Sequence, residues 1–127
     1  MTINRLARIL IPSVIFFGGC AAPSMYQWGA YDRLLYDSYK YADKVDALRQ
    51  GLEAQVTASE LAKRRVAPGL YAEIGTLFLQ AGDTKKAVAF YAREKDAWPE
   101  SVPLMDALIQ NVDKRSSASG NRPGAKP

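Results

Sequence analysis

The sequence predicts an all-α fold in which about five helices form hairpins, followed by a disordered C-terminal tail. Apolar residues recur at the three- and four-residue spacing of helices along most of the chain after Trp28. A Gly-Asp pair, Gly82 and Asp83, separates two of these segments in the way that joins antiparallel helices. Small residues, Gly75 and Ala87, stand on either side of that turn, where two helices can approach closely.

The best-defined hairpin lies between Pro68 and Pro99. Pro68 suits the first position of a helix, because its missing N–H would be unpaired there in any case. We expect Gly82 to take the left-handed conformation that ends the first helix. Asp83 is expected to accept the unpaired N–H groups that open the second helix.

The order of residue types in this hairpin resembles the tetratricopeptide repeat. Large side chains surround a pair of small residues at the predicted helix crossing, which is the arrangement of that repeat. Glu94 is the one departure, since a small residue usually stands at its position. The matching positions are Tyr71, Ile74, Gly75, Phe78, Ala87, Tyr91 and Pro99.

A degenerate copy of the pattern precedes this hairpin, and its second helix is predicted to be overlong. That helix is expected to begin at a cap on Asp43 and to run to Arg65, with a bend or a fresh cap at Thr57 or Ser59. The basic run Lys63–Arg65 suits a helix C-terminus, although three cations could also bind phosphate groups. The apolar positions of the helix are Val45, Leu48, Leu52 and Val56.

Six aromatic residues lie between Tyr26 and Tyr41 and allow two interpretations. The favoured one is a core stripe at helical spacing; the alternative is an exposed patch that stacks on sugars or grips a partner. Tyr36 lies off the stripe and is expected to be exposed. The stripe consists of Trp28, Tyr31, Leu35, Tyr39 and Ala42.

A last helix is predicted after Pro99, closing the hairpin as terminal repeats do. Pro103 is tolerated there because it falls in the first turn. From Lys114 onward Ser, Gly, Pro, Lys and Arg dominate, which predicts a disordered, mildly basic tail. The apolar positions of the helix are Val102, Met105, Leu108, Ile109 and Val112.

The first residues are typical of a targeting signal. Arg5 and Arg8 precede an apolar run, Ile9–Phe17, and the segment Phe17-Gly18-Gly19-Cys20 resembles the bacterial lipobox, in which a cysteine is acylated before cleavage. We expect an acylated Cys20 that holds the protein to the lipid bilayer. Ala21 stands where an Asp would favour inner-membrane retention, so the expected location is the periplasmic face of the outer membrane.

The expected organisation of the chain follows from these elements. It comprises a lipoprotein signal peptide (1–19), a lipidated tether (20–27), a helical-repeat domain (28–113) and a disordered basic tail (114–127).

Charge and composition argue against several functions. Loss of Arg5 and Arg8 with the signal would leave 15 of the 17 basic residues against 13 acidic ones, so nucleic acid is not an expected partner. The chain has no histidine and one cysteine, Cys20, which removes the usual nucleophile systems and zinc sites. We expect no enzyme activity, no catalytic residues, no metal and no cofactor.

Five segments of the chain together carry a resemblance to a known family. They are the lipobox with Cys20, Tyr26-Gln27-Trp28-Gly29-x-Tyr31, Leu34-Leu35-Tyr36, Pro68-Gly69-Leu70-Tyr71-Ala72-Glu73 and Trp98-Pro99-Glu100-Ser101-x-Pro103-Leu104-Met105-Asp106. With these segments, the region from about Phe17 to Val112 resembles a family of small bacterial lipoproteins of unknown function. Members of that family are typically encoded beside a lipoprotein similar to the curli secretion channel, which implies a shared envelope assembly and suggests that protein as a partner.

Two functions follow as expectations. The first is a non-enzymatic adaptor in an envelope or secretion complex, which would bind its partner through Ala72, Thr76 and Leu79, with Gln80 at the rim. These positions fall about 100° round the helix from its expected core stripe. The alternative is that the long helix from Asp43 to Arg65 covers this face. The second is binding of peptidoglycan or another polysaccharide through the aromatic residues near Tyr36.

Overall fold

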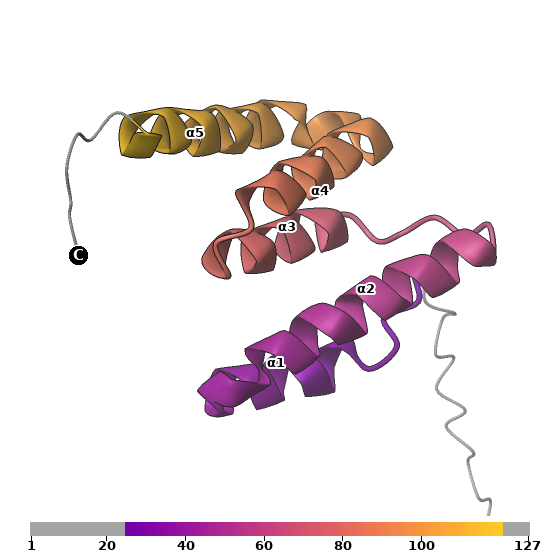
Figure 1. The fold of residues 1–127 in the computed structure, drawn as a ribbon. Helices are drawn as coiled ribbons and strands as arrows, with labels where there is room; N and C mark the ends of the chain where they lie inside the picture. The colour runs from indigo at the N-terminus through magenta and orange to yellow at the C-terminus, as the bar shows by residue number, and fades with distance from the viewer. Residues whose placement is uncertain (1–24, 121–127) are drawn as a thin grey trace, which may run out of the picture.

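A computed structural model describes residues 25–120 of the chain, with side chains to residue 118, and this part is all-α (Figure 1). The predicted signal, Cys20 and the beginning of the tether lie outside the described residues. The helices, including the two short 3₁₀ helices η1 and η2, are α1 (Tyr31–Lys40), η1 (Ala42–Lys44), α2 (Val45–Leu61), α3 (Leu70–Gln80), α4 (Thr84–Ala97), η2 (Pro99–Ser101) and α5 (Val102–Gly120). The predicted fold class, with about five helices, is confirmed.

The helices stack in the order of the chain (Figure 1). α1 lies along α2, α2 crosses α3, α3 and α4 form an antiparallel hairpin, and α5 packs on α4. Each helix therefore contacts chiefly its neighbours in sequence, as in repeat proteins. α1 and α5 stand at the two ends of the stack.

One continuous core joins α2, α3, α4 and α5. At its centre Leu52 of α2, Ile74 of α3 and Ala87 of α4 are completely buried. α1 contributes no buried residue and touches this core only through partly buried side chains. The other buried members are Leu48, Val56, Val66, Leu70, Tyr71, Leu77, Phe78, Tyr91, Met105 and Val112.

The turn between α3 and α4 confirms the roles predicted for Gly82 and Asp83. Gly82 has φ 83°, and its N–H donates to the Leu79 carbonyl at 3.0 Å. The Asp83 N–H donates to the Phe78 carbonyl at 2.9 Å, which completes a Schellman motif. The Asp83 side chain then accepts the Lys86 N–H at 3.0 Å and caps α4.

The close crossing predicted at Gly75 and Ala87 is also present. A Cβ atom placed on Gly75 would lie 2.8 Å from Cε1 of Tyr91 and 3.0 Å from the Ala87 carbonyl oxygen. The second of these atoms belongs to the backbone of α4 at the completely buried Ala87, so it cannot move aside as the end of a side chain can. The small separation between α3 and α4 at this point therefore requires a residue without a side chain.

Two of the predicted helix starts are wrong. α3 begins at Leu70 rather than at Pro68, because Gly69 intervenes with φ 85°, a conformation that an α-helix does not contain. Asp43 caps no helix; it lies in η1, where its carboxylate is 3.7 Å from the Lys44 ammonium.

The predicted bend in α2 is absent, and the helix ends earlier than expected. The hydroxyl groups of Thr57 and Ser59 each donate to the carbonyl four residues earlier at 2.9 Å, so neither competes with the helix. α2 ends at Leu61 instead of Arg65, because Lys63 takes a left-handed φ of 53° and turns the chain away.

The favoured interpretation of the aromatic stripe is wrong for most of its members. Leu35 is 40% exposed and Tyr39 is 91% exposed, because α1 ends the stack and packs chiefly on α2. Tyr31 and Leu34 instead contact the core. Tyr36 is 61% exposed, as expected.

α5 continues past the predicted tail boundary at Lys114 to Gly120, so residues 114–120 are helical. The Ser116 hydroxyl donates to the Val112 carbonyl at 2.9 Å, and that of Ser117 to the Asp113 carbonyl at the same distance. These bonds satisfy the serine hydroxyls within the helix, and the buried side chain of Val112 packs the same part of the helix against the core. Residues 121–127 lie outside the described part.

We expect Gly75→Ala to lower the free energy of unfolding by about 1–3 kcal/mol, although alanine is the better helix former. The added methyl group would press on Tyr91 and on the Ala87 carbonyl. Denaturant titration followed by circular dichroism measures the loss. Gly51→Ala is the control: its methyl group would meet only the end of the Leu34 side chain, which can move. An equal stability of the Gly75→Ala and wild-type proteins would contradict this account.

Candidate partner-binding surfaces

α3 exposes only a narrow strip, because α2 and α4 pack on its other sides. Thr76 lies at the centre of this strip, opposite the buried Ile74. The Thr76 hydroxyl donates to the Ala72 carbonyl at 2.9 Å and lies 3.1 Å from the hydroxyl of Tyr91. Ala72 and Leu79 are half-buried against the core, and Gln80 is exposed. The four residues predicted from sequence thus share one strip, which we call the α3 strip.

α2 approaches the α3 strip from one side. Gln80 lines a hollow of about 270 Å³ together with Val45 and Arg49 of α2. The Arg49 guanidinium lies 4.8 Å from the centre of the Phe78 ring and donates to Glu53 at 2.7 Å. α2 therefore reaches the edge of the strip at Gln80 and leaves Thr76 exposed.

Two tyrosine–carboxylate bonds hold the helices beside the α3 strip. The Tyr31 hydroxyl of α1 donates to Glu73 of α3 at 2.9 Å, and the Tyr71 hydroxyl of α3 donates to Glu60 of α2 at 2.6 Å. Burial, followed by these hydrogen bonds, raises the pKa of Tyr31 and the pKa of Tyr71 to about 12 each. Arg93 of α4 also pairs with Glu60, so the second bond joins three helices.

Glu94, the residue that departs from the repeat pattern, binds the two segments that precede α3 and α5. It is 1% exposed, and its Oε1 accepts the Gly69 N–H at 2.7 Å and the Ser101 hydroxyl at 3.2 Å. Gly69 precedes α3 and Ser101 precedes α5, so one carboxylate ties both helix starts to α4. A small residue at this position could not reach either group.

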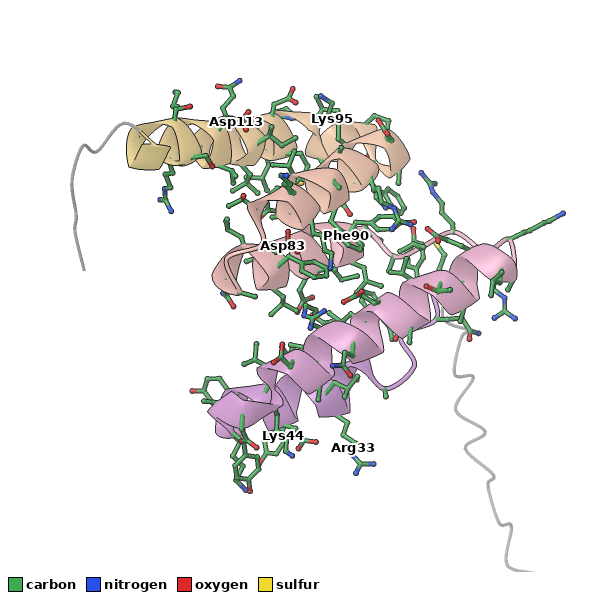
Figure 2. The ribbon with its side chains drawn as sticks, in the orientation of Figure 1. Arg33, Lys44, Asp83, Phe90, Lys95 and Asp113 are labelled. Atoms are coloured by element: carbon green, nitrogen blue, oxygen red, sulfur yellow. The ribbon has the colours of Figure 1, made fainter. Side chains whose placement is uncertain are left out.

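The aromatic residues at the C-terminal end of α1 form a second exposed surface. Tyr36, Tyr39 and Tyr41 are all exposed there. The Lys40 ammonium lies 5.9 Å from the centre of the Tyr36 ring and 5.3 Å from that of Tyr41. Figure 2 shows Lys44, which follows these residues in sequence, on the opposite side of the molecule from Asp113 of α5. The exposure of these three tyrosines agrees with the alternative interpretation of the aromatic residues, an exposed patch.

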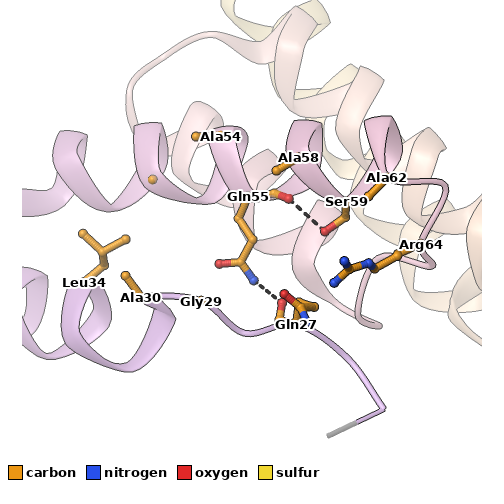
Figure 3. A pocket seen from close by; sticks show the side chains of 11 residues that line it. Gln27, Gly29, Ala30, Leu34, Ala54, Gln55, Ala58, Ser59, Ala62 and Arg64 are labelled. Carbon is orange, nitrogen blue, oxygen red and sulfur yellow. Dashed lines mark hydrogen bonds between the residues drawn. The ribbon is translucent and has the colours of Figure 1, made fainter.

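A pocket between α1 and α2 was not predicted from the sequence. Residues 25–30, which we call the N-terminal segment, run alongside α2, and the Gln27 carbonyl accepts a hydrogen bond from the Gln55 amide (Figure 3). The space between them measures about 480 Å³. Its lining is made mainly of small residues, with one charged side chain at the rim: Gln27, Gly29, Ala30, Leu34, Gly51, Ala54, Gln55, Ala58, Ser59, Ala62 and Arg64.

The signal for this pocket is present in the sequence as a row of small residues. Gly51, Ala54, Ala58 and Ala62 recur at three- and four-residue spacing along one face of α2. α1 has ten residues and α2 has 17, so α1 covers only the first part of this row. The length difference between the two helices leaves the rest open.

Two other features of the described residues bear on function. Between residues 25 and 120 no helix is both long and apolar enough to cross a membrane. The acidic side chains of the same part form no cluster of three that could hold a metal ion.

The chain belongs to a family that is defined by a domain of unknown function, DUF4810, whose sequence model matches residues 25–108. The match covers the helices from α1 into α5 and lies within the region of the family resemblance described above. No curated protein and no solved structure matches the chain. Membership of a family of unknown function is thus confirmed, whereas the lipoprotein character and the neighbouring genes stay predictions.

We expect the free energy of unfolding to fall as the pH rises from about 10 to about 12. An unfolded tyrosine ionises near pH 10, whereas the pKa of folded Tyr31 and Tyr71 is about 12. The neutral hydroxyls therefore stabilise the fold fully below pH 10, and this contribution is lost as both ionise. Denaturant titrations across this range should show a shallower fall for the double variant Tyr31→Phe, Tyr71→Phe than for Tyr36→Phe. Identical slopes would contradict the assignment.

Proposed function

We propose that this protein is a lipid-anchored, non-enzymatic adaptor of the bacterial envelope, held at the periplasmic face of the outer membrane through an acylated Cys20. Its domain would connect an envelope or secretion complex to the membrane. The lipobox-like segment Phe17-Gly18-Gly19-Cys20 supports the anchor. The stack of hairpins supports the adaptor role, because such stacks present continuous binding faces.

The α3 strip is the observation on which the adaptor role rests. α3 lies in the middle of the stack and is buried on most sides, yet Thr76 is exposed, with Ala72 and Leu79 half-buried beside it. A partner seated there would contact the helix that packs against both α2 and α4. It would also cover the apolar side chain of Leu79, which suits the desolvated centre of an interface.

The resemblance to the lipoprotein family supports one partner in particular, a lipoprotein similar to the curli secretion channel. The domain is small, and its helices form little more than two hairpins. A surface of this size fits a weak or multivalent contact, in which the shared membrane raises the effective concentration of both proteins.

A second candidate function is binding of peptidoglycan or another polysaccharide by the tyrosines of α1. The observation that favours it is the group of exposed rings at Tyr36, Tyr39 and Tyr41, with Lys40 near two of them. Sugar rings present C–H faces that pack on aromatic rings. Co-sedimentation with isolated cell-wall sacculi distinguishes this function from the adaptor role.

We expect the mature protein to begin at an acylated Cys20. Mass spectrometry of the protein from bacterial envelopes should give a chain that lacks residues 1–19 and carries the added mass of two or three acyl chains, which hold a protein stably to a bilayer. Cys20→Ser should leave the precursor unprocessed. A soluble chain that begins at another residue would rule out the anchor.

We expect Thr76→Glu to fold and to lose its partner. Thr76 is exposed, so a carboxylate remains in water, and the lost hydroxyl contact with Tyr91 costs about 1 kcal/mol of stability. Co-purification from detergent-solubilised envelopes measures partner binding. Thr57→Glu on α2 is the control, since Thr57 is also exposed and its hydroxyl makes the same bond within its helix.

Leu79→Lys tests the same strip with a side chain that is half-buried against the core. Loss of the partner from folded Thr76→Glu and Leu79→Lys proteins supports the strip as the binding surface. Partner binding that survives in both folded variants would exclude the strip and leave Tyr36 as the next candidate.

A further inference from the structure

We propose that the pocket between α1 and α2 binds a single-chain anionic amphiphile, an aliphatic chain that ends in a carboxylate or a phosphate. The proposal depends neither on the adaptor role nor on acylation of Cys20. It rests on the shape of the pocket, on the chemistry of its lining and on the position of its one charged residue, Arg64.

The pocket is closed at one end. α1 meets α2 so closely there that a Cβ atom on Gly51 would lie 2.3 Å from Cδ1 of Leu34. Figure 3 shows Leu34 and Ala30 at this end of the pocket and Arg64 at the other. From Gly51 to Ala62 the floor measures about 17 Å along the helix. A pocket with one closed end fits the methyl end of an aliphatic chain.

The lining selects an aliphatic chain. The floor consists of Gly51, Ala54, Ala58 and Ala62, whose small side chains leave a smooth apolar surface close to the backbone of α2. The N-terminal segment forms the facing wall and is tied to α2 by the hydrogen bond from the Gln55 amide. The volume of about 480 Å³ lies in the range of small-ligand sites.

The mouth of the pocket selects a negative charge. Arg64 is the only charged residue of the lining, and its side chain extends toward Gln27 in Figure 3. None of the ion pairs or side-chain hydrogen bonds found within residues 25–118 uses the Arg64 guanidinium. Lys63 precedes Arg64 in sequence and adds positive charge at the same end. A carboxylate or phosphate held there gains charge-assisted hydrogen bonds.

Photolabelling of the full chain tests the proposal. The probe is a dodecanoate analogue with a diazirine near its methyl end, added to the protein in aqueous buffer without vesicles. Irradiation should attach the label to the peptide that contains residues 51–62, and mass spectrometry locates it. Dodecanoate should compete for the label, and each two methylene groups removed from the competitor should weaken competition roughly tenfold. Dodecanol should compete at least tenfold more weakly than dodecanoate, because it lacks the charge.

Two variants with matched controls complete the experiment. Ala58→Leu fills the floor and should abolish labelling, whereas Ala107→Leu, at an exposed alanine of α5, should leave it unchanged. Arg64→Gln should weaken competition by dodecanoate roughly tenfold and leave dodecanol unaffected, with Arg33→Gln on α1 as the control. Circular dichroism verifies that each variant is folded.

Three outcomes would overturn the proposal. Labelling that persists in folded Ala58→Leu shows attachment to exposed apolar side chains such as Leu104. Equal competition by dodecanol and dodecanoate shows that no anionic group is recognised. Absence of labelling together with a dimer that Ala58→Leu converts to monomer shows that a second copy of the chain fills the pocket.

Discussion

The close contact between α3 and α4 at Gly75 is the constraint on which the rest of the structure depends. The glycine allows the Tyr91 ring and the Ala87 carbonyl to lie against the backbone of α3. That separation determines which side chains of both helices become core, and α2 and α5 then pack on the two sides of the hairpin. A wider crossing would leave Ile74 and Tyr91 without the neighbours that bury them.

Polar residues then hold the hairpin in register with its neighbours. Glu94 connects the start of α3 to the start of α5, while Glu60 and Glu73 accept tyrosine hydroxyls from other helices. Three carboxylates thus join neighbouring helices. Apolar contacts alone would allow these helices to slide along one another, whereas a hydrogen bond forms only when its donor and acceptor are correctly placed. Each of the three carboxylates belongs to α3 or has a bond to α3 or to the residue that precedes it, so together they fix the position of the helix that carries the proposed binding surface.

The aromatic residues of α1 show the limit of periodicity as evidence. Helical spacing correctly predicted that one face of the segment is rich in large side chains, but it could not say whether a neighbour covers that face. Tyr39 is exposed because no helix precedes α1 among the described residues, and only α2 is available to pack on it. The pocket beside α2 escaped prediction for a related reason, because it arises from the unequal lengths of α1 and α2.

The sequence by itself determined the helical class, the central hairpin and its turn, since Gly75, Gly82, Asp83 and Ala87 have local or nearest-neighbour roles. It also placed Ala72, Thr76, Leu79 and Gln80 on one strip through helical phase. Only the tertiary structure decided what covers each face. The buried role of Glu94, the exposure of Tyr39 and the open floor at Ala58 each depend on segments distant in sequence, whose positions follow from the packing of the whole stack.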